Sequence, residues 1–224
     1  MSTACYLSST GTCFDIGSAV SRHLARFKRT GEPHDPVVDE EAAANGSMMR
    51  LAPVSIRWLK EPATFIAMAA ASSRPTHNAT RPIDACRVLA AMTAALLRGE
   101  TWEVVAPPAF WEQGDLHPEI AVFAAGSWRM KPRHGIRGTG FCVAALEAAI
   151  WPVDMATCFR EAVLNAANLG DDADTTAAIA GQLAGARFGA AGIPAPWLEK
   201  LAMRSRIESL ADALHAAATG KPGA

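Results

Sequence analysis

The spacing of apolar residues is the feature that most constrains the fold of this chain. Aliphatic residues recur at three- and four-residue intervals in several segments, whereas strict alternation of apolar and polar residues is hard to find. The first pattern is typical of amphipathic helices and the second of half-buried strands. We therefore expect an all-α fold with no sheet of more than two short strands. The expected helices cover residues 19–29, 63–73, 83–98, 118–126, 141–150, 155–168, 174–189 and 197–218.

Length and composition predict one globular domain. The 224 residues, half of them apolar, are enough for a substantial core. We expect a single domain over residues 1–218 and a disordered tail over residues 219–224, where Gly, Lys and Pro have nothing to bury. The five cysteines are scattered without C-x-x-C spacing, which favours reduced thiols over disulfides or a zinc site.

Charge and hydropathy exclude two classes of partner. The formal net charge is −1, and acids and bases are interspersed, so there is no basic stripe for a phosphate backbone and no nucleic acid partner is expected. The longest nearly apolar runs, residues 65–71 and 89–97, are far shorter than the roughly 20 residues that cross a bilayer. Residues 1–5 have neither the basic segment nor the apolar segment of a secretory signal, so we expect none. We expect a cytoplasmic monomer that does not bind membranes.

The most informative segment is a carboxylate-rich turn that leads into an apolar helix at residues 168–189. Asp172, Asp174 and Thr175 place three oxygen donors within four residues. Two carboxylates about 4 Å apart repel each other by roughly 4 kcal/mol at an intermediate dielectric, and a divalent cation would relieve that repulsion. Oxygen ligands favour Mg²⁺ or Mn²⁺ over zinc or copper. The alternative is that one aspartate caps the helix while the others complement its dipole from solvent.

Glycines in the same helix indicate close packing. Gly181, Gly185 and Gly189 recur every four residues and would lie on one helix face. Each costs about 1 kcal/mol relative to alanine in a helix interior. We therefore expect a central helix whose glycine face lets another helix approach closely.

The segment Asn-Leu-Gly-Asp-Asp-Ala-Asp-Thr-Thr-Ala-Ala-Ile-Ala-Gly-Gln-Leu-Ala-Gly-Ala, from residue 168 onward, resembles the signature of the ADP-ribosylglycohydrolase family. The resemblance implies a compact orthogonal helical bundle. It also implies that Asp172, Asp174 and Thr175 are ligands of a dinuclear Mg²⁺ or Mn²⁺ centre.

A second segment, Phe-Asp-Ile-Gly at residues 14–17, resembles a family loop whose aspartate and glycine lie beside the substrate ribose and diphosphate. The resemblance makes Asp15 a polar anchor and a candidate acid/base group, and Gly17 a substrate-binding residue. Without the family, this segment is only a turn that enters a helix. Where the family commonly continues with Asn-Thr-Thr, this chain has Ser-Ala-Val at residues 18–20, which removes hydrogen-bonding groups next to the ribose site.

A third segment, Asn-Gly-Ser at residues 45–47, matches a family loop and predicts a cradle for the diphosphate. Gly46 permits close backbone approach to an anion, and Asn45 and Ser47 offer side-chain hydrogen bonds. Taken alone, Asn-Gly-Ser is a common turn. His77 ends a Ser-x-x-Thr-His motif of the family and is expected to contact ADP-ribose or to order the site; a purely structural histidine is an equal alternative.

Two family motifs are missing from the sequence. Members normally begin with a Gly-Asp-Ala-Leu-Gly helix and then a Thr-Asp-Asp-Thr motif, which supplies the other half of the metal ligands. A two-metal site needs carboxylates from both sides, so the predicted metal site is half complete. A start codon placed too far downstream, a truncated gene and a short paralogue are three explanations.

The resemblance implies a hydrolase that removes ADP-ribose from a modified protein or small acceptor by metal-assisted glycosidic hydrolysis. The alternatives are a catalytically impaired ADP-ribose-binding or regulatory module and a truncated remnant of such an enzyme. The expected partner is an ADP-ribosylated protein or an ADP-ribose-containing small molecule. One sequence does not separate arginine-, serine- and nucleic-acid-linked ADP-ribose.

Overall fold

The structure is a computed structural model that describes residues 8–13, 15–40, 43–106, 110–111 and 114–220. Helices make up the regular structure of these residues, and the β structure among them is one isolated antiparallel bridge between Ala44 and Phe141. The all-α prediction is confirmed. The helices are α1 (Ser18–Thr30), α2 (Ala52–Arg57), α3 (Pro62–Ser73), α4 (Thr80–Leu97), α5 (Trp102–Val105), α6 (Pro118–Ala124), α7 (Cys142–Met155), α8 (Phe159–Ala167), α9 (Ala173–Phe188), α10 (Ala195–Lys200) and α11 (Arg204–Thr219). The short 3₁₀ turns are η1 (Met48–Arg50), η3 (Ser127–Met130), η4 (Arg133–Gly135) and η5 (Ala190–Gly192).

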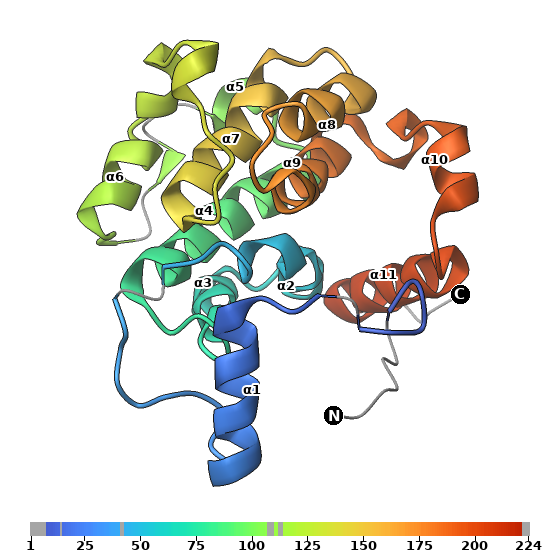
Figure 1. Cartoon of the computed structure of the whole chain (residues 1–224). Coiled ribbons are helices and arrows are strands. Elements are labelled where there is room, and N and C mark those ends of the chain that lie inside the picture. Colours follow the sequence, from blue (N-terminus) through green and yellow to red (C-terminus); the bar gives the residue numbers. More distant parts are fainter. Residues whose placement is uncertain (1–7, 14, 41–42, 107–109, 112–113, 221–224) are drawn as a thin grey trace.

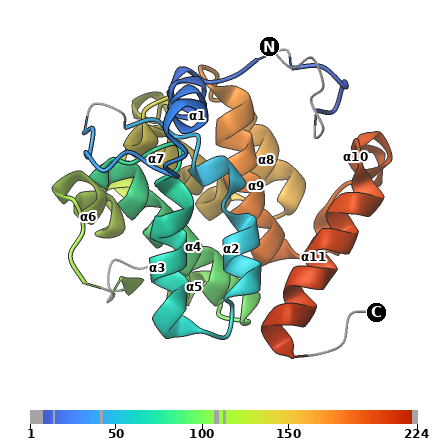
Figure 2. The same ribbon diagram turned by 90° about the horizontal axis from the view of Figure 1, so that it is seen from below.

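Helix α4 lies at the centre of the molecule. Most of its residues are buried, and it packs against α2, α3, α7 and α9. Alanines make up much of its buried surface, and their short side chains let the neighbouring helices approach closely. Helix α9 packs against α4, α7 and α8. These three helices fix its position, and with it the position of the carboxylate-rich turn at its N-terminal end. The helices run in different directions around α4 rather than as a parallel bundle (Figures 1 and 2).

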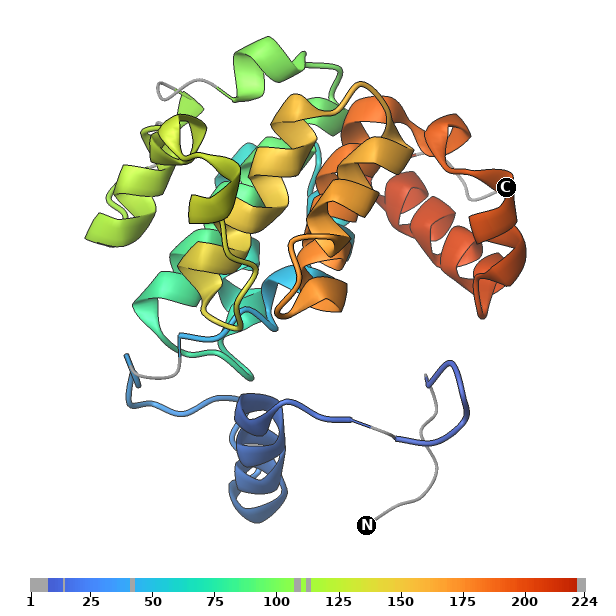
Figure 3. The ribbon, with the colours of Figure 1, turned by 45° about the horizontal axis from the view of Figure 1, so that its top comes forward.

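Two helices lie at the margins of this body. Helix α1 projects away from it, and ion pairs from Arg22 to Asp39 (3.3 Å) and from Arg26 to Asp35 (3.2 Å) join it to the loop that follows (Figures 1 and 3). Helix α11 packs along α2 on the outer flank and has no fully buried residue (Figure 2). No helix of the described segments is both long enough and apolar enough to cross a membrane.

Several predicted helix boundaries were wrong. The single helix expected at residues 197–218 is α10 and α11, separated at Met203, whose φ of 56° is a left-handed conformation that a helix cannot continue through. Helix α7 was expected to end at Ile150, but it continues to Met155 with Pro152 inside it. Helices α2 and α5 were missed because segments of four to six residues are too short to show a period.

The predicted role of the helix glycines was also wrong. Gly189 lies beyond the end of α9, with φ of 75°. Gly181 and Gly185 do face α8, but a Cβ added to either would lie 4.0 Å from a side chain of that helix, which is ordinary contact. The packing of α8 on α9 therefore does not require glycine. At the C-terminus α11 continues through Thr219, and residues 221–224 of the predicted tail lie outside the described residues.

Candidate functional site

The candidate site is centred on the turn that begins α9. Asp172 occupies the N-cap position and Asp174 lies in the first turn, as the sequence predicts. The Asp172 side chain, however, does not cap its own helix. Its Oδ2 instead accepts a hydrogen bond of 2.7 Å from Asn45 Nδ2, 127 residues earlier in the chain. The interpretation of Asp172 as an ordinary capping residue is therefore incorrect, because its carboxylate faces another segment.

Three segments distant in sequence meet at Asp172. The Asn45 side-chain amide also donates to the Thr139 carbonyl (3.3 Å), and the Asn45 backbone N–H donates to the Gly140 carbonyl (3.0 Å). The Asp172 backbone N–H donates to the Gly138 carbonyl at 2.7 Å. A Cβ on Gly138 would lie 2.7 Å from Thr176 Oγ1, so glycine is required for this close approach. The loop around residue 45 and the carboxylate turn thus share one wall, formed by residues 138–140.

His77 lies beneath the Asn-Gly-Ser loop. It is 1% exposed, and a Cβ added to Gly46 would lie 2.9 Å from its ring, so the loop rests directly on the imidazole. Burial, together with the nearby Arg50 guanidinium, lowers the pKa of His77 from 6.5 to about 4, which keeps the ring neutral near pH 7. Ser73 Oγ lies 2.9 Å from both the Ser47 hydroxyl and the His77 carbonyl. Of the two predicted roles, this geometry supports ordering of the loop.

Polar contacts that the sequence did not reveal fix the same region. Arg50 donates to Thr76 Oγ1 (2.6 Å), which lies 2.8 Å from His77 Nδ1. Gln182 of α9 donates to the Met48 carbonyl (2.9 Å), which links η1 to the helix that carries the carboxylates. These contacts could not be read from the sequence because each joins residues whose neighbourhood depends on the fold.

The structure does not bring Asp15 into this cluster. Its carboxylate is exposed and accepts a hydrogen bond from the Ile16 backbone N–H at 2.7 Å. Within the described residues no hydrogen bond or ion pair joins it to Asn45 or Asp172. Gly17 is the exposed N-cap of α1, and Figure 3 shows the segment that leads into α1 standing off from the helical body. Phe14 lies outside the described residues.

A groove of about 410 Å³ opens beside the shared wall. It is lined by Glu40, Ala43, Ala44, Arg81, Gly140 and Phe141.

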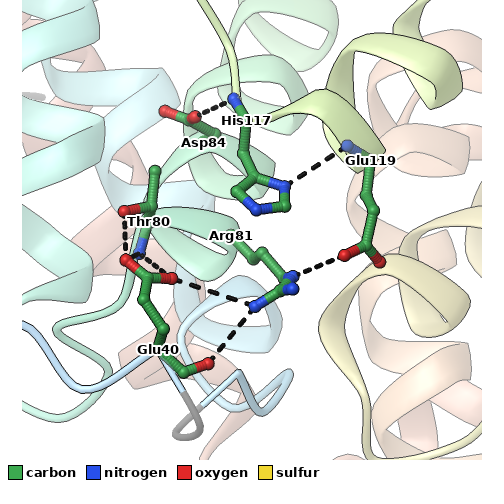
Figure 4. A network of polar contacts seen from close by, with 6 residues as sticks. All are labelled: Glu40, Thr80, Arg81, Asp84, His117 and Glu119. Carbon is green, nitrogen blue, oxygen red and sulfur yellow. Dashed lines mark hydrogen bonds and ion pairs between the residues drawn. The ribbon is translucent and has the colours of Figure 1, made fainter.

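Figure 4 shows the polar network on the charged side of this groove. Arg81 Nε donates to Glu119 Oε1 at 2.7 Å, and its other arm reaches the Glu40 carbonyl at 3.3 Å. The hydrogen bond to Glu119 raises the pKa of Arg81 above its usual value. The Glu40 carboxylate accepts from the Thr80 N–H at the start of α4, at 3.2 Å. The Arg81 guanidinium thus lies between two carboxylates, 2.7 Å from that of Glu119 and 3.9 Å from that of Glu40.

The donor set at the turn suits one side of a Mg²⁺ or Mn²⁺ site. Asp172 and Asp174 offer carboxylates and Thr175 a hydroxyl, all hard oxygen donors. The described residues contain no group of three or more His, Cys, Asp or Glu side chains arranged to hold a metal.

Comparison with known proteins identifies the family. The model of the ADP-ribosylglycohydrolase family matches residues 2–223. The chain belongs to the ADP-ribosylglycohydrolase family. It is 40% identical over 207 residues to ADP-ribosylarginine hydrolase Tri1 of Pseudomonas putida, covering 92% of this chain and 55% of the relative. It is 37% identical over 207 residues to Tri1 of Serratia proteamaculans, covering 92% of this chain and 56% of that relative.

Two further relatives of this ADP-ribosylglycohydrolase chain agree with that assignment. The ADP-ribosyl-[dinitrogen reductase] glycohydrolase of Rhodospirillum rubrum is 30% identical over 194 residues, covering 87% of this chain and 62% of the relative. A solved structure described as an ADP-ribosylglycohydrolase-related protein complex superimposes with a TM-score of 0.81 at 36% identity, covering 90% of this chain and 69% of that one. The chain spans just over half the length of the two Tri1 relatives.

Proposed function

We propose that this chain forms the ADP-ribose-binding cleft of a hydrolase that removes ADP-ribose from a modified protein, with an arginine side chain as the acceptor. The observation that carries the proposal is the 2.7 Å hydrogen bond between Asn45 and Asp172. It joins the predicted diphosphate loop to the predicted metal ligands in a single wall. The arginine acceptor is supported by the names of the two Tri1 relatives.

The residues of the cleft have distinct tasks in this proposal. The 45–47 loop binds the diphosphate in this proposal, and the missing side chain of Gly46 lets the neutral His77 ring hold the loop from below. Asn45 fixes the direction of the Asp172 carboxylate. Asp172, Asp174 and Thr175 would hold Mg²⁺ or Mn²⁺, which when bound would polarise the ribose hydroxyls and activate water. Asp15 remains the predicted acid/base group, and it would have to reach the cleft from its exposed position.

A second function, an ADP-ribose-binding module without effective catalysis, is favoured by the small number of metal donors. Two carboxylates and one hydroxyl leave a cation held largely by water, so it would be poorly placed to stabilise developing charge. The diphosphate loop does not depend on those donors. Binding of ADP-ribose could therefore survive where hydrolysis does not.

The test measures ADP-ribose binding by calorimetry and hydrolysis of an ADP-ribosylarginine peptide with Mg²⁺, Mn²⁺ or EDTA. Hydrolysis that EDTA and Asp174→Ala both abolish would support the hydrolase. Binding without hydrolysis would support the binding module. Binding of neither ADP-ribose nor peptide would refute both. Asp212→Ala, at an exposed acid on α11, is the control for a change of charge alone.

A further inference from the structure

We propose that the ion pair between Arg137 and Asp171 is a positioning device for the metal-binding turn. It holds Asp171 in a strained backbone conformation and thereby directs the Asp172 and Asp174 carboxylates into the cleft. The use of those carboxylates rests on the proposed function, whereas the effect of the ion pair on the turn does not.

The first observation is the backbone of Asp171. Its φ is 54°, in the left-handed region, which few non-glycine residues adopt and which aspartate adopts when its side chain is held by local hydrogen bonds. Met203 is the other non-glycine residue with positive φ in the described part of the chain, and it lies at the break between α10 and α11. Backbone strain of this kind persists where surrounding contacts impose it, and it concentrates at functional sites. Some contact must therefore hold Asp171 immediately before the first predicted metal ligand.

The second observation is that Arg137 supplies that contact. Its Nε donates to Asp171 Oδ2 at 2.9 Å and its Nη2 donates to Asp171 Oδ1 at 3.1 Å. Two parallel bonds from a planar guanidinium fix the orientation of a carboxylate, which a single bond does not.

The third observation is that hydrogen bonds join the segment at residues 137–139 to the segment at residues 171–172 in consecutive order. Arg137 binds Asp171, and the next residues along each segment are joined by the 2.7 Å bond from the Asp172 N–H to the Gly138 carbonyl. The Asn45 amide then bridges the Thr139 carbonyl and the Asp172 carboxylate. The side-chain ion pair is thus the outermost of three successive links that place Asp172.

The Arg137 and Asp171 side chains are too exposed for their ion pair to contribute much to the stability of the whole protein. The Arg137 side chain is 65% exposed and that of Asp171 is 31% exposed. Ion pairs as exposed as this contribute little to the free energy of unfolding. Loss of the pair should therefore leave global stability nearly unchanged while it lets the turn relax and moves Asp172 relative to Asn45.

The Asn45 side-chain amide provides a readout that needs no metal. Its ¹⁵N–¹H resonances report the bond to Asp172 in the metal-free protein. Mn²⁺ binding, followed by electron paramagnetic resonance of the free ion, is the second readout. The variants are Arg137→Ala, Arg137→Lys and the double variant Arg137→Ala/Asp171→Gly, because glycine adopts positive φ without strain. Arg160→Ala, at an exposed arginine on α8, is the matched control.

We expect Arg137→Ala to shift or broaden the Asn45 amide resonances and to weaken Mn²⁺ binding by up to about fivefold, which is the most that loss of an exposed ion pair can shift a local equilibrium. Arg137→Lys should be intermediate, and Asp171→Gly should restore both readouts in the Arg137→Ala background. The thermal midpoints of all variants should stay close to that of the wild type.

Two results would overturn the positioning role: unchanged Asn45 resonances in Arg137→Ala, or no recovery in the double variant. If the amide responds as expected but the wild-type protein binds no Mn²⁺, the positioning role stands and the metal part of the proposed function fails.

Discussion

Gly138 is the residue at which the site has no space for a side chain. A Cβ there would lie 2.7 Å from the buried Thr176 Oγ1 and 3.4 Å from the Gly170 carbonyl, whereas a Cβ on Gly140 would meet nothing within 4 Å. We predict that Gly138→Ala lowers the free energy of unfolding by about 1–3 kcal/mol, the usual cost of overpacking. Gly140→Ala should have little effect. Urea denaturation of both variants measures the difference.

Thr176 offers a rescue for that variant. Its Oγ1 is buried without a hydrogen-bond partner among the described residues, so its removal breaks no hydrogen bond and frees the space that a Cβ at residue 138 needs. Thr176→Ala should therefore recover part of the stability lost in Gly138→Ala. Equal effects of Gly138→Ala and Gly140→Ala would show that the close approach is not as the structure has it.

His77 should make the stability of the protein depend on pH. Because the pKa of His77 is about 4 in the native protein and 6.5 in the unfolded chain, the unfolded chain alone takes up a proton between these values. The neutral His77 ring therefore makes its full contribution to the free energy of unfolding above pH 6.5, and this contribution is lost as the pH falls towards 4. At about 1.4 kcal/mol per pKa unit, the loss approaches roughly 3 kcal/mol.

Urea denaturation between pH 4.5 and 7 measures this dependence. His77→Gln should flatten the profile even if it lowers stability at pH 7, and His134→Gln, at an exposed histidine, should not. A profile that His77→Gln leaves equally steep would assign the dependence to other groups.

The site residues differ in whether the sequence alone could predict them. Asn45 and Asp172 were predicted separately, from two motifs that resemble the family, and the structure joins them. Arg137 and Asp171 were not predicted as a pair. Nothing in the sequence reveals that Asp171 has positive φ, and an exposed arginine in a loop looks like an ordinary solubilising residue.

Among the elements, apolar spacing predicted the long helices of the body well and their ends less well. Helix α3 was expected at residues 63–73 and runs from Pro62 to Ser73. The break between α10 and α11 was missed because the helix was predicted from apolar spacing over residues 197–218, and no Gly or Pro lies between Leu198 and Ile207 to mark a break. A backbone reversal at one residue leaves no trace in such a pattern, so periodicity shows that helices exist and does not show where they stop.

Helix α1 should be much less protected than the central helix α4. His23 is its one buried residue among the described ones, and Leu24 and Phe27 are 45% and 50% exposed. Helix α4, by contrast, is buried along most of its length. We predict that the amides of α1 exchange with deuterium at least tenfold faster than those of α4, because few buried contacts oppose local opening. Mass spectrometry of peptides from both helices measures the ratio, and equal protection would mean that α1 is covered in solution.

For the whole molecule, the site exists only when the fold is complete. Asn45, Thr139 and Asp172 come from three segments, and the helices that carry them meet around α4. Composition and periodicity predicted a helical protein but could not place these segments side by side. The two residues were predicted to lie in one cleft with Asp15 only because the resemblance carries the geometry of the family; the structure joins Asn45 to Asp172 and leaves Asp15 apart from them.

Metal binding should depend on the whole fold in the same way. If Mn²⁺ binds Asp172, Asp174 and Thr175 as proposed, it binds the native protein more tightly than the unfolded chain, where Asn45 and residues 138–140 no longer fix the position of Asp172. Binding must then raise the free energy of unfolding, by at most about 1.4 kcal/mol at a tenfold excess over the Kd. With so few donors we expect a Kd near the millimolar range, so the midpoint of thermal unfolding should begin to rise only at millimolar Mn²⁺ and then climb with the logarithm of its concentration. Asp174→Ala should abolish the rise and Asp212→Ala should preserve it. A midpoint that does not respond to Mn²⁺, or that responds equally in Asp174→Ala, would place any metal site elsewhere in the protein.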